Sequence, residues 1–474
     1  MAHNIPTFGV ITSVLTRFEG RFGQSEPEPN RGFVEISATD VFAPTVKMEF
    51  ERATVNPNFI HFRFCYSNRY WSLPSPTSSS IVAVSDQKNE DTSQQTCTLF
   101  EPVFDAQTAT YSIRFVHNGR FVRVTNGNRR VITDNLGPGG VDQFFRFNLT
   151  EWDTFIKLPK YITFRGHNNK FLKPFTRQGV VYHSFSSDES NDRETAYEVI
   201  EIGDGHVRIR PLALETDQVL RRNRDDWIGL SIPDRTRETL FWPVKVGGRI
   251  IALRSAGNDR ICRSLTQGNM TDCLTAQATG LISQSRLTVS ELVMGRRIYD
   301  VVYHMDNARI YGHRAVVTGS GRSTNSGTEE ATQTISISFT DTSSYTFSNS
   351  NSLSTGVTTS VTAGFGSIVS MEVGIQISSE QTVSVEVGEE VSRSVTTETS
   401  YTTPVPPMST VIVNYVATEG KCDIPFSYTQ RDQDSVDGSF RFSNNNDGVY
   451  TGVNYFSFHF EQPQFRSLQE TESD

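Results

Sequence analysis

A short motif that recurs through the first 295 residues constrains the fold of this chain most strongly. Each copy has a short strand that often contains Arg, then a turn of Asn, Asp or Gly, then a polar residue followed by an aromatic or branched one. The six copies read TRFEGRF, RFCYSNRY, RFVHNGRF, RGHNNKF, LETDQV and SAGNDRI, and they end at Phe22, Tyr70, Phe121, Phe171, Val219 and Ile261. Their ends lie roughly 48 residues apart, which is typical of a repeated structural unit.

A longer echo groups the six copies into two sets of three. TLFEPV at 98–103 returns as TLFWPV at 239–244. A unit of ~48 residues suits four short strands, and three such units make a β-trefoil. The composition agrees, because Phe, Tyr, Gly and Ser are frequent and long helical patterns are missing. We therefore predict an all-β chain with two tandem β-trefoils, at 1–152 and 153–295, and a third β domain at 296–474.

The third domain has longer alternating segments that are rich in Ser and Thr. Alternation of apolar and polar residues predicts strands with one buried face. We predict a loop at Thr318–Thr328, where Gly and Ser cluster, and a chain break at Pro404–Pro407. The predicted strands are Ile298–Tyr303, Ala308–Val317, Thr334–Phe339, Gln381–Val387, Val411–Val416, Phe440–Phe442 and Val449–Phe460.

Within this domain, residues 352–379 form an amphipathic segment with apolar residues at odd positions and polar residues at even positions. A turn at Gly366–Ile368 would pair Val361 with Val373, so that apolar residues face each other. Each arm then has about the 9–11 residues that a tilted strand needs to cross a bilayer. The pattern favours a membrane-inserting hairpin, and the alternative is an ordinary sheet with one buried face.

On the inserting interpretation, residue parity assigns the two faces of the hairpin. A lone hairpin exposes unpaired backbone groups, so it crosses lipid only when a homo-oligomer closes it into a barrel. The membrane-facing residues of the inserting hairpin would be Val357, Val361, Phe365, Val369, Met371, Val373, Ile375 and Ile377, and Ile368 would lie in its leading tip. The pore-lumen residues would be Thr358, Ser360, Glu372 and Gln376. A ring of Glu372 carboxylates would favour cations.

The first two domains resemble the amaranthin-type agglutinins of plants. The resemblance rests on Phe62–Trp71, Cys97–Pro102, Leu158–Leu172 and Asp226–Ile228. It implies two tandem β-trefoils that bind glycans containing galactose or N-acetylgalactosamine.

The third domain resembles the aerolysin family of β-pore-forming proteins. This resemblance rests on the Ser/Thr-rich strands around the amphipathic segment and on the run Gly448–Phe456. It implies a protein that assembles into a ring and contributes one hairpin per copy to a transmembrane barrel. Together, the two resemblances predict a lectin that targets a pore-forming module to glycan-bearing membranes, in plant defence. The alternative is a non-lytic lectin whose third domain only oligomerises.

A sugar site combines an aromatic face with polar groups that orient hydroxyls. Asp225, Asp226 and Trp227 supply both in one polar stretch, and Trp71 is a second candidate. The competing interpretation is that each Trp belongs to a core, because trefoils bury many aromatic side chains; for Trp242 we favour packing. The corresponding stretch of the first trefoil, Ser78–Ile81, has no aromatic residue. The recurring Asn68, Asn118 and Asn168 are expected to satisfy turn geometry.

Other functions have little support in the sequence. The net charge of −9 argues against a nucleic-acid partner. We find no catalytic motif, no cofactor fingerprint and no metal-ligand spacing, and we expect Asp432–Gly438 to be a polar turn rather than a calcium site. The N-terminus lacks the pattern of a signal peptide, so we expect a cytoplasmic protein that becomes membrane-associated when active.

Overall fold

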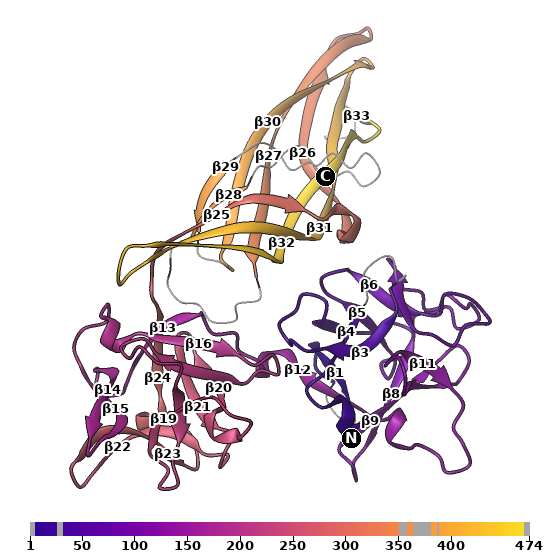
Figure 1. Ribbon diagram of the computed structural model, residues 1–474. Helices are drawn as coiled ribbons and strands as arrows, with labels where there is room; N and C mark the ends of the chain where they lie inside the picture. Colours follow the sequence, from indigo (N-terminus) through magenta and orange to yellow (C-terminus); the bar gives the residue numbers. More distant parts are fainter. Residues whose placement is uncertain are drawn as a thin grey trace. The chain divides into compact units, whose positions relative to one another are not determined.

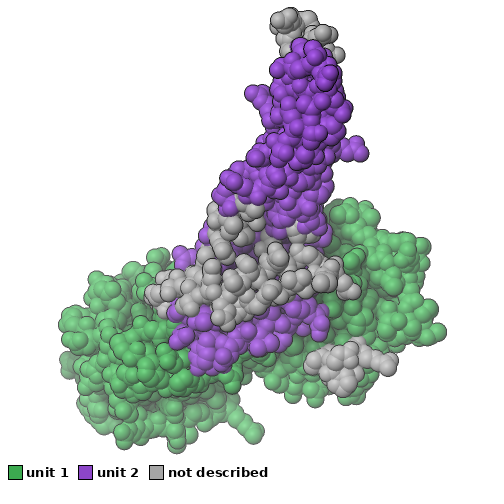
Figure 2. All heavy atoms as spheres, turned by 90° about the horizontal axis from the view of Figure 1, so that it is seen from above, with its two compact units in different colours: residues 1–296, 350–358, 430–447 green, residues 297–349, 359–429, 448–474 purple. Residues whose placement is uncertain are grey.

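The computed structural model describes residues 5–25, 32–349, 357, 359–363, 381–385 and 388–468 (Figure 1). These residues form strands joined by turns and short 3₁₀ helices, so the predicted all-β class is confirmed. None of the described helices is long and apolar enough to cross a membrane. The chain divides into two compact units (Figure 2). The first comprises 1–296, 350–358 and 430–447, and the second comprises 297–349, 359–429 and 448–474.

The described residues of the predicted first trefoil form twelve strands. Ten form one sheet in the order β11-β10-β9-β12-β1-β4-β5-β6-β7, with β8 paired to β5 and β9, and β2 pairs with β3. The strands are β1 (Phe8–Ser13), β2 (Phe22–Ser25), β3 (Val34–Ala38), β4 (Met48–Arg52), β5 (Ile60–Phe64), β6 (Arg69–Ser72), β7 (Val82–Ser85), β8 (Phe100–Asp105), β9 (Thr110–Phe115), β10 (Phe121–Val124), β11 (Val131–Asp134) and β12 (Phe147–Glu151). Its 3₁₀ helices are η1 (Thr16–Phe18), η2 (Gln143–Phe145) and η3 (Trp152–Thr154).

The described residues of the predicted second trefoil also form twelve strands. Ten strands form one sheet in the order β14-β15-β23-β22-β21-β20-β17-β16-β13-β24, and β18 pairs with β19. The strands are β13 (Tyr161–Arg165), β14 (Phe171–Arg177), β15 (Val180–Ser187), β16 (Tyr197–Glu201), β17 (Val207–Pro211), β18 (Val219–Arg222), β19 (Ile228–Ser231), β20 (Phe241–Gly247), β21 (Ile250–Ser255), β22 (Ile261–Gln267), β23 (Met270–Ala278) and β24 (Leu287–Glu291). Its 3₁₀ helices are η4 (Arg193–Thr195), η5 (Arg237–Thr239) and η6 (Ser283–Ser285).

The arginine of the repeated motif forms a cross-strand pair in several of the repeats. In three repeats it lies directly opposite a glutamate on the neighbouring antiparallel strand, where the opposite charges stabilise the sheet. These cross-strand pairs are Glu49–Arg63, Glu101–Arg114 and Glu198–Arg210. In a fourth unit Trp242 takes the place of the glutamate and stands opposite Arg254.

The two trefoils also contact each other within the first unit. Val41 and Phe42 of the first trefoil share an apolar cluster with Phe155, and Trp242 packs at its margin. The backbone N–H of Val41 donates to the carbonyl of Gly203 at 2.7 Å. The expected packing role of Trp242 is therefore confirmed.

The third sheet follows, drawn in orange to yellow in Figure 1. Its order is β29-β28-β25-β31-β32-β27-β30, and β26 and β33 each pair with β31. The strands are β25 (Val293–Tyr303), β26 (Arg309–Asn325), β27 (Ala331–Ser348), β28 (Thr359–Ala363), β29 (Gln381–Val385), β30 (Glu390–Val405), β31 (Ser409–Asp434), β32 (Phe440–Phe460) and β33 (Gln464–Ser467). One 3₁₀ helix, η7, spans Met305–Asn307.

The loop predicted at Thr318–Thr328 is wrong over most of its length, because β26 continues to Asn325. The glycines that suggested a loop instead allow close packing. A Cβ at Gly319 would lie 2.7 Å from a methyl carbon of Ile337, and one at Gly321 would lie 2.5 Å from a methyl carbon of Ile335. These isoleucines of β27 are buried, as the alternation at 334–339 predicted.

Two other predicted boundaries also move. The segments predicted at 440–442 and 449–460 belong to one strand, β32. Pro404 lies inside β30, opposite Thr332, and the strand ends at Val405. Proline is accepted there because β30 is the last strand in its sheet order, so one side of its backbone needs no ladder partner.

The acidic turn at 432–438 is a polar turn, as predicted. Asp434 accepts a hydrogen bond from the backbone N–H of Val436 at 2.6 Å, and Asp437 accepts one from Ser439 at 2.9 Å. Asp432 pairs through both carboxylate oxygens with Arg296, at 2.8 and 2.9 Å. The same guanidinium reaches Glu291 of β24, so this buried ion cluster attaches the turn to the second trefoil.

Candidate carbohydrate-binding site

Trp227 lies in a tight turn between β18 and β19. The backbone N–H of Asp226 donates to the carbonyl of Asn223 at 3.0 Å, and the N–H of Asn223 donates to the carbonyl of Trp227 at 2.8 Å. Asp226 has a φ of 66°, a left-handed conformation that Asp tolerates better than most residues. The backbone of Trp227 then forms a bridge to Thr275 of β23, which ties the turn to that strand.

The carboxylate of Asp226 is engaged within the protein. It accepts hydrogen bonds from Arg222 at 2.7 Å and from Asn258 at 3.0 Å. Arg222 also donates to both carboxylate oxygens of Glu238, at 2.8 and 2.9 Å. Burial alone would lower the pKa of Arg222, but these two carboxylates raise it. Asp226 is therefore a positioning residue that holds the Trp227 loop.

A hydrogen-bond arrangement in which a turn Asn amide donates to an Asp and to a backbone carbonyl occurs twice in this trefoil. The side-chain amide of Asn258 donates to the carbonyl of Ala276 at 2.9 Å as well as to Asp226. The amide of Asn168 donates in the same way to the carbonyl of Phe185 and to Asp272, both at 2.9 Å. The expectation that Asn168 satisfies turn geometry is confirmed.

Two of the predicted residues are presented outward on this loop. Asp225 is exposed, and Trp227 is half-buried beside it. The side chain of Gln277 donates to the backbone carbonyl of Asp225 at 3.4 Å, so the Asp225 carboxylate is not the group used in that contact. Trp227 and Asp225, two residues apart, supply the aromatic ring and the carboxylate with which protein sites hold a pyranose.

The first trefoil shares two backbone contacts with this loop but lacks the aromatic ring. Ser80 forms a bridge to Ile132, as Trp227 does to Thr275. The N–H of Thr133 donates to the carbonyl of Ser79 at 2.7 Å, matching the 2.8 Å bond from Ala276 to Asp226. These two contacts agree with the predicted correspondence between Ser78–Ile81 and the Trp227 loop, although Asp226 is left-handed and Ser79 is not.

Trp71 does not belong to a sugar site, and that prediction is wrong. Its side chain is 0% exposed. The indole stacks on Phe62, with ring centroids 4.5 Å apart and an interplanar angle of 19°, and packs edge-on against Phe100. It lies inside the core because β6 pairs with β5, and a ring at that position faces the apolar centre of the trefoil.

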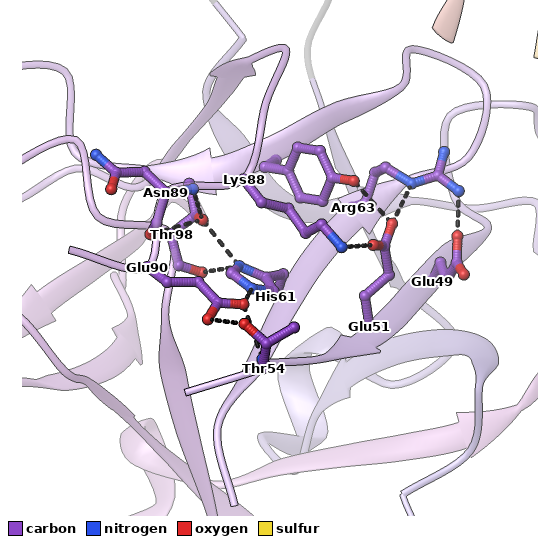
Figure 3. Close-up of polar contacts among 10 residues, drawn as sticks. Glu49, Glu51, Thr54, His61, Arg63, Lys88, Asn89, Glu90 and Thr98 are labelled. Carbon is purple, nitrogen blue, oxygen red and sulfur yellow. Dashed lines mark hydrogen bonds and ion pairs between the residues drawn. The ribbon is translucent and has the colours of Figure 1, made fainter. Parts of the chain in front are cut away.

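A polar cluster in the first trefoil was not found from the sequence (Figure 3). Arg63 forms ion pairs with Glu49 and Glu51, and Lys88 reaches Glu51 at 3.0 Å. The Arg63 side chain is almost fully buried. The sequence signal was the strand arginine of the repeat, but its two acidic partners lie on another strand. Tertiary pairing brings them together.

The same cluster continues through a buried histidine (Figure 3). His61 contacts the hydroxyl of Thr98 at 2.8 Å and the carboxylate of Glu90 at 3.3 Å. Glu90 also accepts from the N–H groups of Thr54 and Val55, each at 2.9 Å. Although burial raises the pKa of Glu90, these donors lower it to about 2. These contacts attach the segment before β8 to β4 and β5, which is a structural role.

The hairpin segment is described only in part. Thr359 and Val361 are buried while Ser360 and Thr362 are half-buried, so the predicted parity is confirmed over this stretch, and Val357 is half-buried. The register is different, because Val361 pairs with Val383 rather than with Val373. The ten-residue difference preserves parity, which is why alternation could not reveal it. The other predicted positions lie outside the described residues: Thr358, Phe365, Ile368, Val369, Met371, Glu372, Val373, Ile375, Gln376 and Ile377.

Comparison with known proteins gives one family match. The Agglutinin domain family matches residues 24–134, within the first trefoil. No curated protein sequence matches the chain significantly.

Among solved structures, the chain is similar to the hemolytic lectin CEL-III, with 12% identity over 95% of this chain and 94% of that one and a TM-score of 0.30. It is also similar to an aerolysin-like protein of Bombina maxima, with 12% identity over 36% and 99% and a TM-score of 0.24. A mosquitocidal holotoxin matches with 13% identity over 62% of this chain and a TM-score of 0.29, and the chain spans 35% of that toxin's length. Because these scores are low, the assignment of the site rests on the residues of this chain.

Proposed function

We propose that this chain is a carbohydrate-binding lectin that delivers a membrane-inserting hairpin to glycan-bearing membranes. The observation that carries the lectin part is the pairing of Trp227 with Asp225 on a loop that the Asp226 network holds in place. The Agglutinin match at 24–134 supports it. The proposed ligands are glycans that contain galactose or N-acetylgalactosamine, and the proposed setting is plant defence by a cytoplasmic protein that becomes membrane-associated when active.

The lectin part is tested with a glycan array, using the full chain and its Trp227→Ala variant. We expect wild type to bind a defined glycan class and Trp227→Ala to lose at least about tenfold in affinity, because stacking on one aromatic ring is worth ~1.5 kcal/mol. Ser80→Ala, at the matching position of the first trefoil, serves as the control and should leave binding unchanged. Wild-type protein that binds no glycan would refute the lectin proposal.

The pore part rests on the alternation of 352–379, of which the described residues 359–362 retain the expected buried and half-buried pattern. Assembly into a homo-oligomer is required on physical grounds, because the edges of a single hairpin leave backbone groups unpaired in lipid. Ring closure would place each copy's hairpin beside that of the next copy.

Dye leakage from liposomes that display the bound glycan tests this part. Val373→Asp places a charge on the proposed lipid face and should abolish leakage while glycan binding is retained. Gln376→Asp, on the proposed lumen face, is the matched control and should retain leakage. Equal leakage by both variants would contradict the face assignment. Binding by wild type without any leakage would favour the non-lytic lectin, whose third domain only oligomerises.

A further inference from the structure

We propose a second carbohydrate-binding site in the groove between the two trefoils, with Trp242 as its aromatic wall and Asp204 as its charged group. The groove has a volume of about 580 Å³ and is lined from the first trefoil by Ser13, Asn148 and Thr150 and from the second by Asp204 and Trp242. The inference rests on the proposed lectin function and adds a site to it.

Trp242 is the one departure from the longest internal echo of the chain. TLFEPV at 98–103 and TLFWPV at 239–244 differ only where Glu101 is replaced by Trp242. Glu101 pairs across the strands with Arg114, with a hydrogen bond of 2.7 Å. Trp242 stands opposite Arg254, which instead reaches the exposed Asp259 at 3.5 Å. A position that breaks the local rule of its own fold is a candidate for a function.

The backbone beside Trp242 is shaped to receive the ring. Gly205 has a φ of 98°, and a Cβ there would lie 2.8 Å from Cη2 of Trp242 and 2.9 Å from Cδ1 of Phe155. The indole contacts Phe155 and His206, with ring centroids 5.5 and 5.0 Å apart. These contacts fix the ring, and the side chain stays half-buried where it lines the groove.

The polar groups of the groove are also held in place. Asp204 accepts hydrogen bonds from the backbone N–H of His206 at 2.9 Å and from its ring at 3.1 Å. Burial raises the pKa of Asp204, but the bonds from His206 lower it overall, so the carboxylate is ionised at neutral pH. On the facing wall, Asn148 of β12 is paired with Thr12 of β1.

This combination has the chemistry of a saccharide site. An indole offers a flat apolar surface to the C–H face of a pyranose, and the carboxylate, amide and hydroxyl groups bind its hydroxyls. The volume lies within the ~300–1,000 Å³ range of small-ligand sites, which suits a mono- or disaccharide. The competing explanation is that Trp242 only packs the two trefoils together.

Isothermal titration of the full chain with the best glycan found on the array separates these explanations. The protein is produced in bacteria, so that the Asn148-Leu149-Thr150 sequon in the groove carries no glycan. We expect two sites per chain. Asp204→Asn, which keeps an oxygen for the His206 N–H, should remove one site or weaken it at least about tenfold, and Trp227→Ala should remove the other. Thermal melting of each variant checks that it is folded.

Trp242→Phe provides an independent variant, since a smaller ring still contacts Phe155. It should weaken the same site as Asp204→Asn. If Asp204→Asn and Trp242→Phe both retain wild-type stoichiometry and affinity while Trp227→Ala abolishes all binding, the groove is a packing contact and this inference is overturned, whereas the lectin proposal survives. Wild type that binds no glycan overturns both.

Discussion

The two trefoils each have one ten-stranded sheet and one strand pair among their described residues, but they differ at the positions suited to a ligand. Where the first has Ser80 and Glu101, the second has Trp227 and Trp242. One bridge and one backbone hydrogen bond match at Ser80 and Trp227, and Glu101 and Trp242 hold equivalent places opposite an arginine. These four side chains are half-buried and lie outside the central core of their domain, so their chemistry differs without a change in that core.

The first trefoil has a feature of its own, which is a nearly buried cluster of charged side chains around Arg63. Arg63 has two acidic partners, and the His61–Glu90 contact attaches the segment before β8. In the second trefoil, the arginine of the Trp242 unit, Arg254, is partly exposed. We therefore expect the first trefoil to depend more on ion pairs for stability and the second to hold the sugar chemistry.

The largest predicted effect comes from removing a strand arginine in each domain. Arg63→Met leaves Glu49 and Glu51 without their buried partner and should lower the free energy of unfolding by ~3–5 kcal/mol. Arg254→Met should cost less than about 1 kcal/mol, because its ion pair is exposed. Urea denaturation of the full chain measures both. Equal losses of unfolding free energy would show that the two arginines contribute equally to stability, against this prediction.

The second prediction concerns pH and the buried His183. Its ring contacts the hydroxyl of Tyr197 at 3.0 Å, and burial lowers its pKa from 6.5 to about 3. The unfolded chain therefore takes up a proton first as the pH falls, so stability is complete above pH 6.5 and declines toward pH 3. Between pH 7 and pH 4 the loss should be ~3 kcal/mol, seen as a falling melting temperature.

Substitution of His183 and of His61, which lie in different trefoils, compares the acid sensitivity of the two domains. His183→Gln should flatten the pH dependence of the melting temperature. His61→Gln should flatten it less, because burial also lowers the pKa of His61 but its contact with Glu90 works in the opposite direction. A larger effect from His61 would place the acid-sensitive group in the first trefoil.

A smaller effect is predicted at two glycines with positive φ. Gly205→Ala forces a Cβ against Trp242 in addition to backbone strain, and should cost ~2–3 kcal/mol and weaken binding in the groove. Gly119→Ala in the first trefoil, where no atom lies within 4 Å of the added Cβ, should cost only ~1 kcal/mol. Thermal melting of the two variants compares strain with and without the collision.

The smallest effect on stability is expected from moving the sugar loop chemistry to the first trefoil. Ser78→Asp with Ser80→Trp, which places the groups of Asp225 and Trp227 at the matching positions, should change the free energy of unfolding by less than about 1 kcal/mol, because both side chains are only half-buried. The variant should gain a weak additional glycan site, measured as a higher stoichiometry in titration calorimetry. A loss of folding would show that the two loops are not interchangeable.

Much of the fold could be predicted because it is encoded in local periodicity. Alternation identified the strands around Ile335 and Ile337 and the parity of Val361. The sequence pattern gave a wrong prediction at Gly319 and Gly321. Their composition is typical of a loop, but both lie in a strand that packs against isoleucine side chains. Alternation also failed on the partner of Val361, since every even shift of register preserves the same faces.

The sequence by itself determined the all-β class, the repeat of strand arginine and turn asparagine, and the loop that presents Asp225 and Trp227. Only the tertiary structure decided which aromatic rings are available, because burial depends on the strand that covers each ring: Trp71 is enclosed by Phe62 and Phe100, whereas Trp242 lines a groove. It also decided that Asp226 supports its loop, because Asn258, one of its partners, lies on another turn. Such contacts join residues that are distant in the chain, so the local periodicity of the sequence cannot predict them.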